Sequence, residues 1–215
     1  MSLIVKICGL TSRDAAAAAA RAGADMGGFV FFEKSPRHLN SFDQARDIAV
    51  ALGPKVAKVS LTVDASDDLL REIIAGLAPD YLQLHGQESP ERVTEIKAVF
   101  GLPVIKACPI SDKEDVETAC LYQGHADLLL FDAKPPKSGA SRPGGLGEVF
   151  NWSLLSGVSW KTPWLLAGGL NPENVADAIS AVLPGGVDVS SGVEVSPGVK
   201  SPELIERFVA NARKA

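Results

Sequence analysis

Short apolar segments rich in β-branched residues alternate with helical segments from one end of the chain to the other. Eight apolar segments are predicted to be strands, over residues 3–9, 24–32, 55–63, 80–86, 103–109, 127–134, 163–169 and 185–193. Each is followed by signals for the start of a helix. Such repeats build a parallel sheet, because each helix must carry the chain back before the next strand can run the same way.

Several helix starts are predicted from capping residues. Two segments match the capping-box spacing, beginning at Ser41 and at Ser111. Three others begin with a capping residue followed by a proline, which is favoured at the first helical position, at Ser89, Asn171 and Ser201. These signals support the strand and helix order independently of helix propensity.

Eight repeats in 215 residues correspond to roughly 27 residues each, which predicts a compact (β/α)8 TIM barrel. No linker or shift in composition divides the chain, so residues 1–215 are predicted to form one domain. An open doubly wound sheet is the alternative. It is weakened because no strand leads into a GxGxxG motif and because eight units would make an unusually wide open sheet.

One connection is much longer than the others. Residues 135–147, after the sixth predicted strand, are rich in Gly and Pro. Loops that follow barrel strands lie on the catalytic face, and long ones there are typical of lids or binding loops. We expect a lid, and a passive surface insertion is the alternative.

Composition and charge exclude several classes of protein. The 21 Lys and Arg residues against 26 Asp and Glu give a net charge of -5, and no basic block could neutralise a nucleic acid backbone. Cys8, Cys108 and Cys120 match neither a disulfide framework nor a metal-ligand spacing, so we expect no metal and a reducing, cytoplasmic setting. No signal peptide, membrane span or membrane partner is predicted, and oligomeric state is left open.

The end of the first strand offers a candidate base. Alternation along the strand places Lys6 and Cys8 on one face, with Cys8 nearest the active mouth and close to solvent. A thiol accepts a proton once its surroundings adjust its pKa, and the Lys6 cation would assist. The alternative is that Cys8 is a small buried apolar residue.

Asp132 is the second candidate for proton transfer. It follows four apolar residues at the end of the sixth strand, and a carboxyl group there would be costly inside a core. We therefore expect it to emerge at the strand end, where it can give or take a proton. The alternative is a structural carboxylate paired with Lys134 or bonded to the lid backbone.

The last two repeats resemble a phosphate cradle, in which backbone N–H and hydroxyl groups converge on a dianion. The residues involved are Gly168, Gly169, Asp188, Ser190, Ser191 and Gly192. Because these two motifs contain no Lys or Arg, we expect neutral groups to hold the phosphate. Lys200 is taken as a surface charge.

Arg37 and His85 also stand at predicted strand ends. The Arg37 guanidinium could bind a substrate carboxylate through two parallel hydrogen bonds, or it could be a solvated surface side chain. His85 has no HxxH or HxxxE companion, so it is interpreted as a positioning or structural residue facing the substrate and not as a metal ligand.

Seven motifs carry a resemblance to a known family. They are KICGLT at 6–11, SPR at 35–37, QLHG at 83–86, FD at 131–132, RPGG at 142–145, LAGGLNP at 166–172 and DVSSGVE at 188–194. In this order they span the whole chain, and together they resemble the phosphoribosylanthranilate isomerase family of tryptophan biosynthesis. The cysteine of strand one and the aspartate of strand six separate this family from neighbouring phosphosugar barrels.

The resemblance implies a cofactor-free Amadori rearrangement of N-(5'-phosphoribosyl)anthranilate from an aldose to a ketose. Cys8 matches the family's general base and Asp132 its general acid, while Arg37 matches the contact to the anthranilate carboxylate. The substrate-binding residues expected on this basis are Arg37, His85, Gly145, Gly168, Gly169, Asp188, Ser190, Ser191 and Gly192.

This chain departs from the family pattern at two positions. Leu146 replaces a polar residue of the lid, and Asn151 replaces an aspartate that caps a helix.

Two other functions are considered. The first is a histidine-pathway aminoaldose isomerase, which is disfavoured because strand one ends in Cys8 where that class has an aspartate. The second is a non-catalytic phosphosugar-binding barrel.

Overall fold

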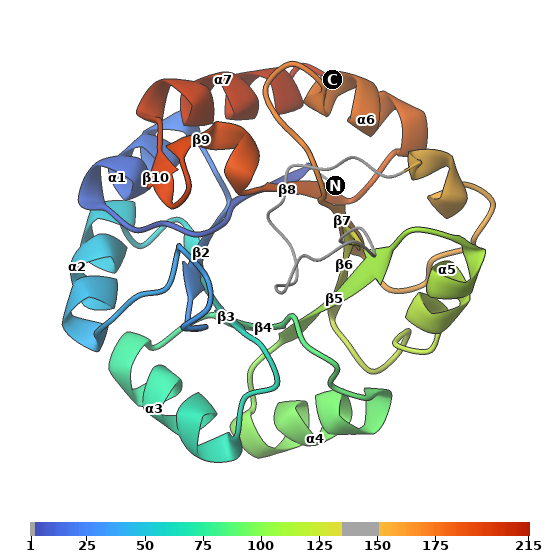
Figure 1. The fold of residues 1–215 in the computed structure, drawn as a ribbon, viewed down its shortest axis with the longest axis horizontal. Helices are drawn as coiled ribbons and strands as arrows, with labels where there is room; N and C mark the ends of the chain where they lie inside the picture. Colours follow the sequence, from blue (N-terminus) through green and yellow to red (C-terminus); the bar gives the residue numbers. More distant parts are fainter. Residues whose placement is uncertain (1–2, 135–150) are drawn as a thin grey trace.

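The computed structural model describes residues 3–134 and 151–215, and its eight principal strands close into a barrel (Figure 1). In chain order the strands are β1 (Ile4–Ile7), β2 (Met26–Val30), β3 (Ala57–Thr62), β4 (Tyr81–Leu84), β5 (Val104–Ile110), β6 (Leu128–Ala133), β7 (Trp164–Leu166) and β8 (Gly186–Val189). Each pairs in parallel with the next, and β8 pairs with β1 to complete the ring. The predicted (β/α)8 barrel is confirmed, and the open-sheet alternative is wrong.

Helices surround the barrel. The α-helices are α1 (Arg13–Ala22), α2 (Phe42–Leu52), α3 (Asp67–Leu77), α4 (Pro90–Phe100), α5 (Lys113–Cys120), α6 (Val175–Val182) and α7 (Pro202–Ala212). Between β6 and β7, the described residues contain only the short 3-10 helix η1 (Trp152–Leu155). After β8 come η2 (Ser191–Val193) and a hairpin of β9 (Glu194–Ser196) and β10 (Val199–Lys200) before α7 begins.

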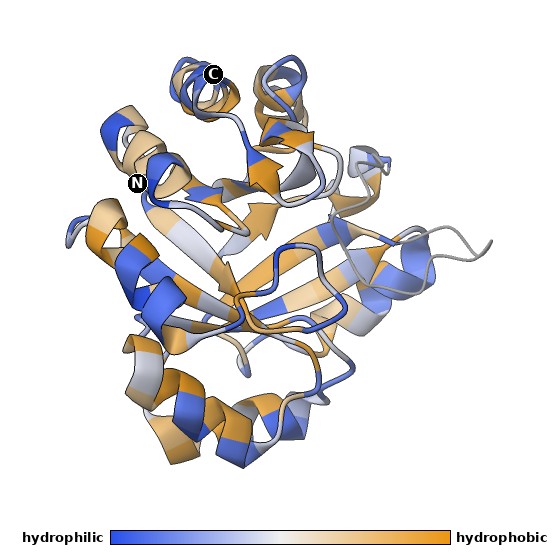
Figure 2. Cartoon of the chain, turned by 60° about the vertical axis from the view of Figure 1, so that its left-hand side comes forward, coloured by the Kyte–Doolittle hydropathy of each residue, from blue (hydrophilic) through white to orange (hydrophobic). Residues whose placement is uncertain are grey.

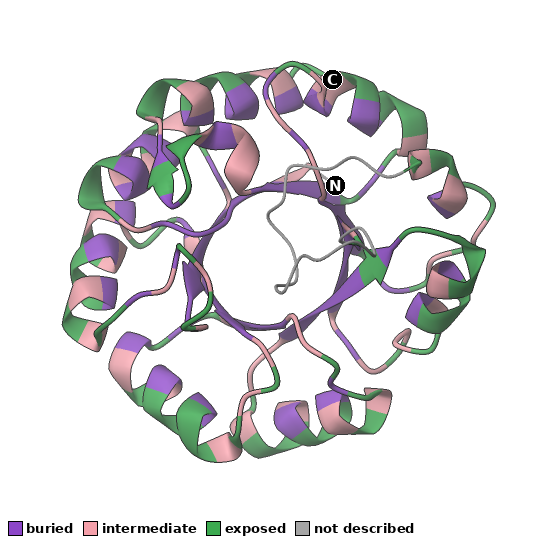
Figure 3. Ribbon diagram, viewed as in Figure 1, coloured by how far each residue is buried: buried purple, intermediate pink, exposed green. Residues whose placement is uncertain are grey.

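The helices are amphipathic and bury one face against the barrel. Hydrophilic and hydrophobic residues alternate along them (Figure 2), and the exposed residues lie on the outer side of the ring (Figure 3). The layer between helices and strands includes the fully buried Phe29, Phe131 and Phe208. Within the described ranges, no helix is long and apolar enough to cross a membrane.

Three predicted helix caps are confirmed and two are wrong. The hydroxyl groups of Ser41, Ser89 and Ser201 accept hydrogen bonds from the backbone N–H three residues later. At the fifth repeat Asp112 caps α5, because its carboxylate accepts from the Asp115 N–H while the Ser111 hydroxyl donates to the Asp115 carboxylate.

The wrong prediction at Asn171 has a local cause. Its side-chain oxygen accepts the N–H groups of Glu173 and Asn174 at 2.9 and 3.0 Å, which makes a turn instead of a helix start. The N-cap therefore lies three residues later, at Asn174, and the α6 helix begins at Val175.

The packing inside the barrel shows which side chains reach its open end. Met26, Val59, Ile105, Leu130 and Leu165 belong to the apolar cluster that fills the interior. Successive residues of a strand point to opposite faces, so the residue two positions beyond an interior residue also points inward. The polar residues of the site follow these apolar layers toward the carboxyl ends of the strands.

Candidate active site

Cys8 and Asp132 both follow interior apolar residues toward the mouth of the barrel. Ile4 packs against the interior cluster, which puts Lys6 and Cys8 on the same inward face of the first strand. Leu128 and Leu130 belong to that cluster, which puts Asp132 on the inward face of β6. Both side chains therefore lie on inward faces, toward the carboxyl ends of their strands.

The thiol of Cys8 occupies a space left open by a glycine. The Cys8 N–H donates to the Val189 carbonyl at 2.8 Å, which ties the end of the first strand to β8. A Cβ atom added at Gly28 in β2 would lie 2.8 Å from the Cys8 sulfur. Cys8 is only 5% exposed, so the expectation that it lies close to solvent is wrong.

Lys6 and Asp188 form a buried ion pair at the seam between β1 and β8. They are partners in the strand register, and Lys6 Nζ donates to Asp188 Oδ1 at 2.8 Å. Burial alone would lower the pKa of Lys6, but the charges of Asp188 and Cys8 outweigh it and the pKa is raised. Lys6 is therefore held as a cation on the same face as Cys8.

Opposing influences act on the Cys8 thiol. Burial raises its pKa, the Lys6 charge lowers it, Asp188 raises it, and Lys200 lowers it again. The net direction is upward, so the neutral thiol is favoured over the thiolate. The two lysines counteract part of the cost of forming the thiolate.

Asp132 is held by its own strand end and faces His85. Its Oδ1 accepts the Ala133 N–H at 2.9 Å, and its Oδ2 lies 3.5 Å from His85 Nε2. The alternative that Asp132 pairs with Lys134 is wrong, because Lys134 Nζ donates to Asp115 at 2.6 Å.

His85 follows β4 and lies between two polar side chains. Its Nδ1 is 3.1 Å from Nε2 of Gln83, which precedes it by two residues on the same inward face. The partnership with Asp132 was missed from the sequence because the two residues lie on different strands. The sequence feature that could have indicated this contact is that both residues lie at the carboxyl ends of predicted barrel strands.

Arg37 is buried against the first repeat and holds a carboxylate of this chain. Its Nε and Nη2 donate to the two carboxylate oxygens of Glu194 at 2.7 and 2.8 Å. Its Cδ lies so near Gly9 that an added Cβ there would be 2.5 Å away. The solvated-surface alternative is wrong, and the bidentate geometry predicted for a carboxylate is present with Glu194.

Lys200 was predicted to be a surface charge, and this is wrong. Its side chain is fully buried, and its Nζ donates to Glu194 Oε1 at 2.5 Å and to the backbone oxygen of Ser190 at 3.2 Å. Burial lowers the pKa of Lys200. Burial alone would raise the pKa of Glu194, but Arg37 and Lys200 outweigh it and lower that pKa. The β9 and β10 hairpin brings this cation underneath the predicted phosphate cradle.

The two loops predicted to form the cradle lie against each other. Gly168 and Gly169 adopt left-handed backbone angles, with φ of 80° and 67°. A Cβ atom at Gly192 would lie 1.9 Å from the Leu170 carbonyl oxygen, so the loop after β8 packs directly on the turn after β7. The Ser190 hydroxyl donates to the Cys8 carbonyl at 3.1 Å, which joins the cradle to the candidate base.

The predicted lid remains a prediction. The lid at 135–147, with Gly145 and Leu146, lies outside the described residues. The substituted Asn151 caps η1, as its side chain accepts the Ser153 N–H at 3.1 Å.

Across residues 3–134 and 151–215, no group of three or more His, Cys, Asp or Glu side chains is arranged to hold a metal ion.

Comparison with known proteins identifies relatives over nearly the whole chain. Residues 5–211 match the family model described as N-(5'phosphoribosyl)anthranilate (PRA) isomerase. An N-(5'-phosphoribosyl)anthranilate isomerase of Rhodopseudomonas palustris (strain HaA2) is 55% identical over 99% of this chain and 97% of its own length. One of Parvibaculum lavamentivorans is 53% identical over the full length of both chains.

Solved structures give the same relationship. Phosphoribosyl anthranilate isomerase from Thermotoga maritima has a TM-score of 0.87 and 39% identity, covering 99% of this chain and 100% of the other. A second isomerase structure has a TM-score of 0.83 and 35% identity over the same shares of both chains. That protein is in complex with reduced 1-(o-carboxyphenylamino)-1-deoxyribulose 5-phosphate.

Proposed function

The chain belongs to the N-(5'-phosphoribosyl)anthranilate isomerase family, and from this premise we propose that Cys8 is the general base and Asp132 the general acid of its reaction. The reaction is the Amadori rearrangement of phosphoribosylanthranilate, an aldose, to a 1-deoxyribulose 5-phosphate, a ketose, in tryptophan biosynthesis. The histidine-pathway and non-catalytic alternatives are therefore set aside.

In the proposed acid step, Asp132 donates its proton to the oxygen of the furanose ring. The C1–O bond breaks, the ring oxygen becomes a hydroxyl group, and the nitrogen lone pair forms a C1=N iminium. The carboxyl group suits this role because it emerges from an apolar strand at the interior mouth, with one oxygen fixed by the Ala133 N–H.

In the proposed base step, Cys8 removes the proton from C2. The C2–H electron pair forms a C1=C2 double bond and returns the iminium electrons to nitrogen, which gives an enolamine. The enolamine tautomerises to the ketone. Because burial raises the pKa of Cys8, the nearby cations Lys6 and Lys200 support the thiolate that this step requires.

The proposed substrate contacts divide between two ends of the site. Bonds to Glu194 use Nε and Nη2 of Arg37, and we assign Nη1 to the anthranilate carboxylate. The phosphate is assigned to the cradle formed by Gly168, Gly169, Ser190, Ser191 and Gly192, with Asp188 below it. The family relationship and the direct packing of the two loops support this assignment.

The observation that carries the proposal is that Cys8 and Asp132, far apart in the chain, both lie on inward faces toward the carboxyl ends of the barrel strands. A fluorescence assay that follows the loss of phosphoribosylanthranilate tests the reaction. Alkylation of Cys8 with and without the reduced product analogue tests the site. Turnover that survives complete alkylation of Cys8 would overturn the base assignment.

Two further properties of the protein are proposed, its location and its domain organisation. The cytoplasm is the proposed location, because Cys8, Cys108 and Cys120 are all free thiols, as a reducing compartment would keep them. Residues 1–215 are proposed to form one domain, because the strands from β1 to β8 close a single ring.

A further inference from the structure

His85 is a polar residue at the barrel mouth to which the proposed mechanism gives no step. Its ring is only slightly exposed and lies between Gln83 on its Nδ1 side and Asp132 on its Nε2 side, at 3.1 and 3.5 Å. The contact with Gln83 orients the ring so that its Nε2 edge faces Asp132. The proposed acid is one of the two groups that it faces.

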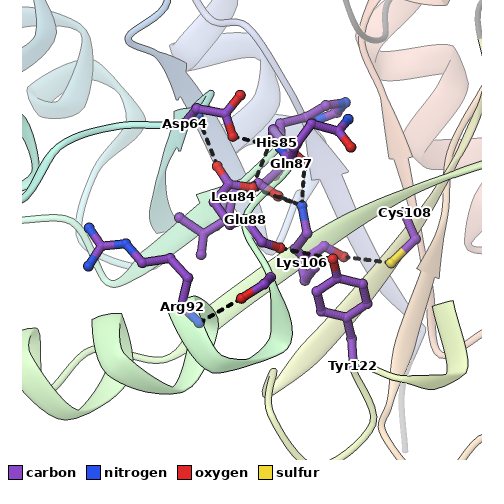
Figure 4. Close-up of polar contacts among 12 residues, drawn as sticks. Asp64, Leu84, His85, Gln87, Glu88, Arg92, Lys106, Cys108 and Tyr122 are labelled. Atoms are coloured by element: carbon purple, nitrogen blue, oxygen red, sulfur yellow. Dashed lines mark hydrogen bonds and ion pairs between the residues drawn. The ribbon is translucent and has the colours of Figure 1, made fainter. Parts of the chain in front are cut away.

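The backbone that carries His85 is also fixed, by a buried ammonium group behind it. Lys106 Nζ donates to the carbonyl oxygens of Leu84 at 3.4 Å and Gly86 at 2.7 Å, the residues on either side of His85 (Figure 4). Lys106 is 2% exposed, and its Nζ also donates to Glu88 Oε2 at 2.8 Å. The position of His85 therefore depends on a cation from the neighbouring strand.

Glu88 completes this support. Its Oε2 accepts the Gly86 N–H at 3.0 Å and its Oε1 accepts the Asp64 N–H at 2.9 Å, while the Tyr122 hydroxyl donates to its backbone oxygen at 2.9 Å. A buried ion pair gains little net stability, because removing both charges from water costs about as much as their attraction returns. Its contribution here is geometric: it joins the loops after β3 and β4 to strand β5.

The hydrogen-bond pattern also assigns the imidazole tautomer. The Gln83 amide nitrogen is a donor, so His85 Nδ1 is the acceptor and the ring proton is on Nε2, which faces Asp132. Gln83 Oε1 is buried and has no partner among the described residues. The reverse amide orientation would leave two N–H donors unpaired in its place, which is less favourable.

We propose that His85 is a positioning residue for the acid step, acting through the carboxyl group of Asp132. Its Nε2 lies 3.5 Å from Oδ2, while the Ala133 N–H donates to Oδ1, so each carboxyl oxygen faces a nitrogen of the protein. A small shortening of this distance gives an Nε2–H···Oδ2 hydrogen bond, which becomes more favourable as negative charge develops on Asp132 during proton donation. This inference rests on the assignment of Asp132 as the general acid.

The first test compares His85→Leu with His85→Gln in the fluorescence assay. For His85→Leu, kcat is expected to fall on the order of 10–100-fold, the size of effect seen for residues that orient reacting groups. KM and the affinity for the reduced product analogue are expected to change by less than about threefold. His85→Gln retains an amide donor near the position of Nε2 and is expected to recover most of the loss.

Two controls separate positioning from folding. His125→Leu, at a histidine whose Nδ1 contacts Thr94 on the helical layer, is the matched substitution and should leave kcat unchanged. Thermal melts by circular dichroism are recorded for each variant. A rise in KM with unchanged kcat for His85→Leu would show that His85 binds substrate directly and would overturn the inference.

The decisive test places His85→Leu in an Asp132→Asn background. If His85 acts through Asp132, adding His85→Leu to Asp132→Asn changes kcat by less than about twofold, since the group that it orients is already gone. Full additivity of the two losses would overturn the inference. Full activity of Asp132→Asn alone would instead overturn the acid assignment, whatever the His85 variants show.

Discussion

Lys6 and Asp188 are direct neighbours across the seam where β8 meets β1, and their side chains form a buried ion pair of 2.8 Å. The pair lies one inward position below Cys8 on the first strand. It joins two residues that are 182 positions apart in the chain. The electrostatic environment of the candidate base is therefore created by closure of the barrel.

We expect Lys6→Met to lower both stability and turnover. The substitution leaves Asp188 buried without its partner, which should lower the free energy of unfolding by about 3–5 kcal/mol. It also removes a charge that lowers the pKa of Cys8, so the acidic limb of the turnover profile should move to higher pH. Urea unfolding and a pH series of kcat measure the two effects.

The double variant Lys6→Met/Asp188→Leu is the control for this prediction. It removes both charges and should recover most of the lost stability without restoring turnover. Recovery of full turnover in the double variant would show that the pair serves only the fold.

Cys8→Ala is expected to reduce turnover by 10²–10⁴-fold, the contribution of a general base. Because Cys8 is buried, a small loss of about 1 kcal/mol in unfolding free energy should accompany it. Turnover and circular dichroism are measured on the same preparation. More than about a tenth of wild-type turnover in a folded variant would contradict the base assignment.

Asp132→Asn retains the size and hydrogen-bonding capacity of the side chain but removes the transferable proton. Turnover should fall steeply, while the affinity for the reduced product analogue changes much less. Calorimetric titration with the analogue provides the second measurement. If affinity collapses and turnover per bound substrate is retained, Asp132 is a binding residue.

Cys108 should make the protein less stable at alkaline pH. Burial raises its pKa from the reference value of 9.0 to about 12. Above pH 9 the unfolded chain loses this proton while the folded chain retains it, so stability falls as pH rises from 9 toward 12. At pH 10.5 the loss from this group is about 2 kcal/mol.

Cys108→Ala removes the ionisable group and gives the matched comparison. Its unfolding free energy should decline less than that of the wild type between pH 8 and pH 10.5 in urea titrations. Equal declines in the two proteins would show that Cys108 ionises normally in the folded state.

The phosphate cradle is best tested at Ser191. Substitutions at Gly192 and Lys200 would disturb the fold, because an added Cβ at Gly192 meets the Leu170 carbonyl and Lys200 is buried in an ion pair. Ser191→Ala should weaken a non-reactive phosphosugar analogue by roughly 10-fold, as expected for a lost hydrogen bond to a charged group. Ser156→Ala, at an exposed serine before β7, is the control, and equal affinity of both variants would remove Ser191 from the cradle.

The fold was predictable from local pattern, because eight apolar strand segments in regular alternation with helices admit few topologies. Strand ends were less predictable. The segment at 163–169 was predicted as one strand, but β7 ends at Leu166 and Gly168 and Gly169 turn with positive φ. Alternation was sufficient to place Cys8 on an inward face, and the cost of burying a carboxyl group was sufficient to place Asp132 at the end of its strand.

The charged partners of the site were not predictable in the same way. Nothing local to Arg37 indicates Glu194, which lies 157 residues away and is brought near by the β9 and β10 hairpin. The same hairpin folds Lys200 under Ser190, against the expectation of a surface charge. Such pairings follow from the packing of distant loops, for which a single sequence carries no periodic signal.

The seam between β8 and β1 also bears on how the chain becomes an enzyme. Lys6 lies in β1, Cys8 directly follows it, and Asp188 lies in β8, so no contiguous half of the chain contains the candidate base together with its complete surroundings. A partly folded form that lacks β8 would have much of the native secondary structure. In that form Asp188 would not yet pair with Lys6, so the electrostatic environment of Cys8 would be incomplete. Catalytic competence is in this sense a property of the closed ring and is acquired when the last strand docks against the first.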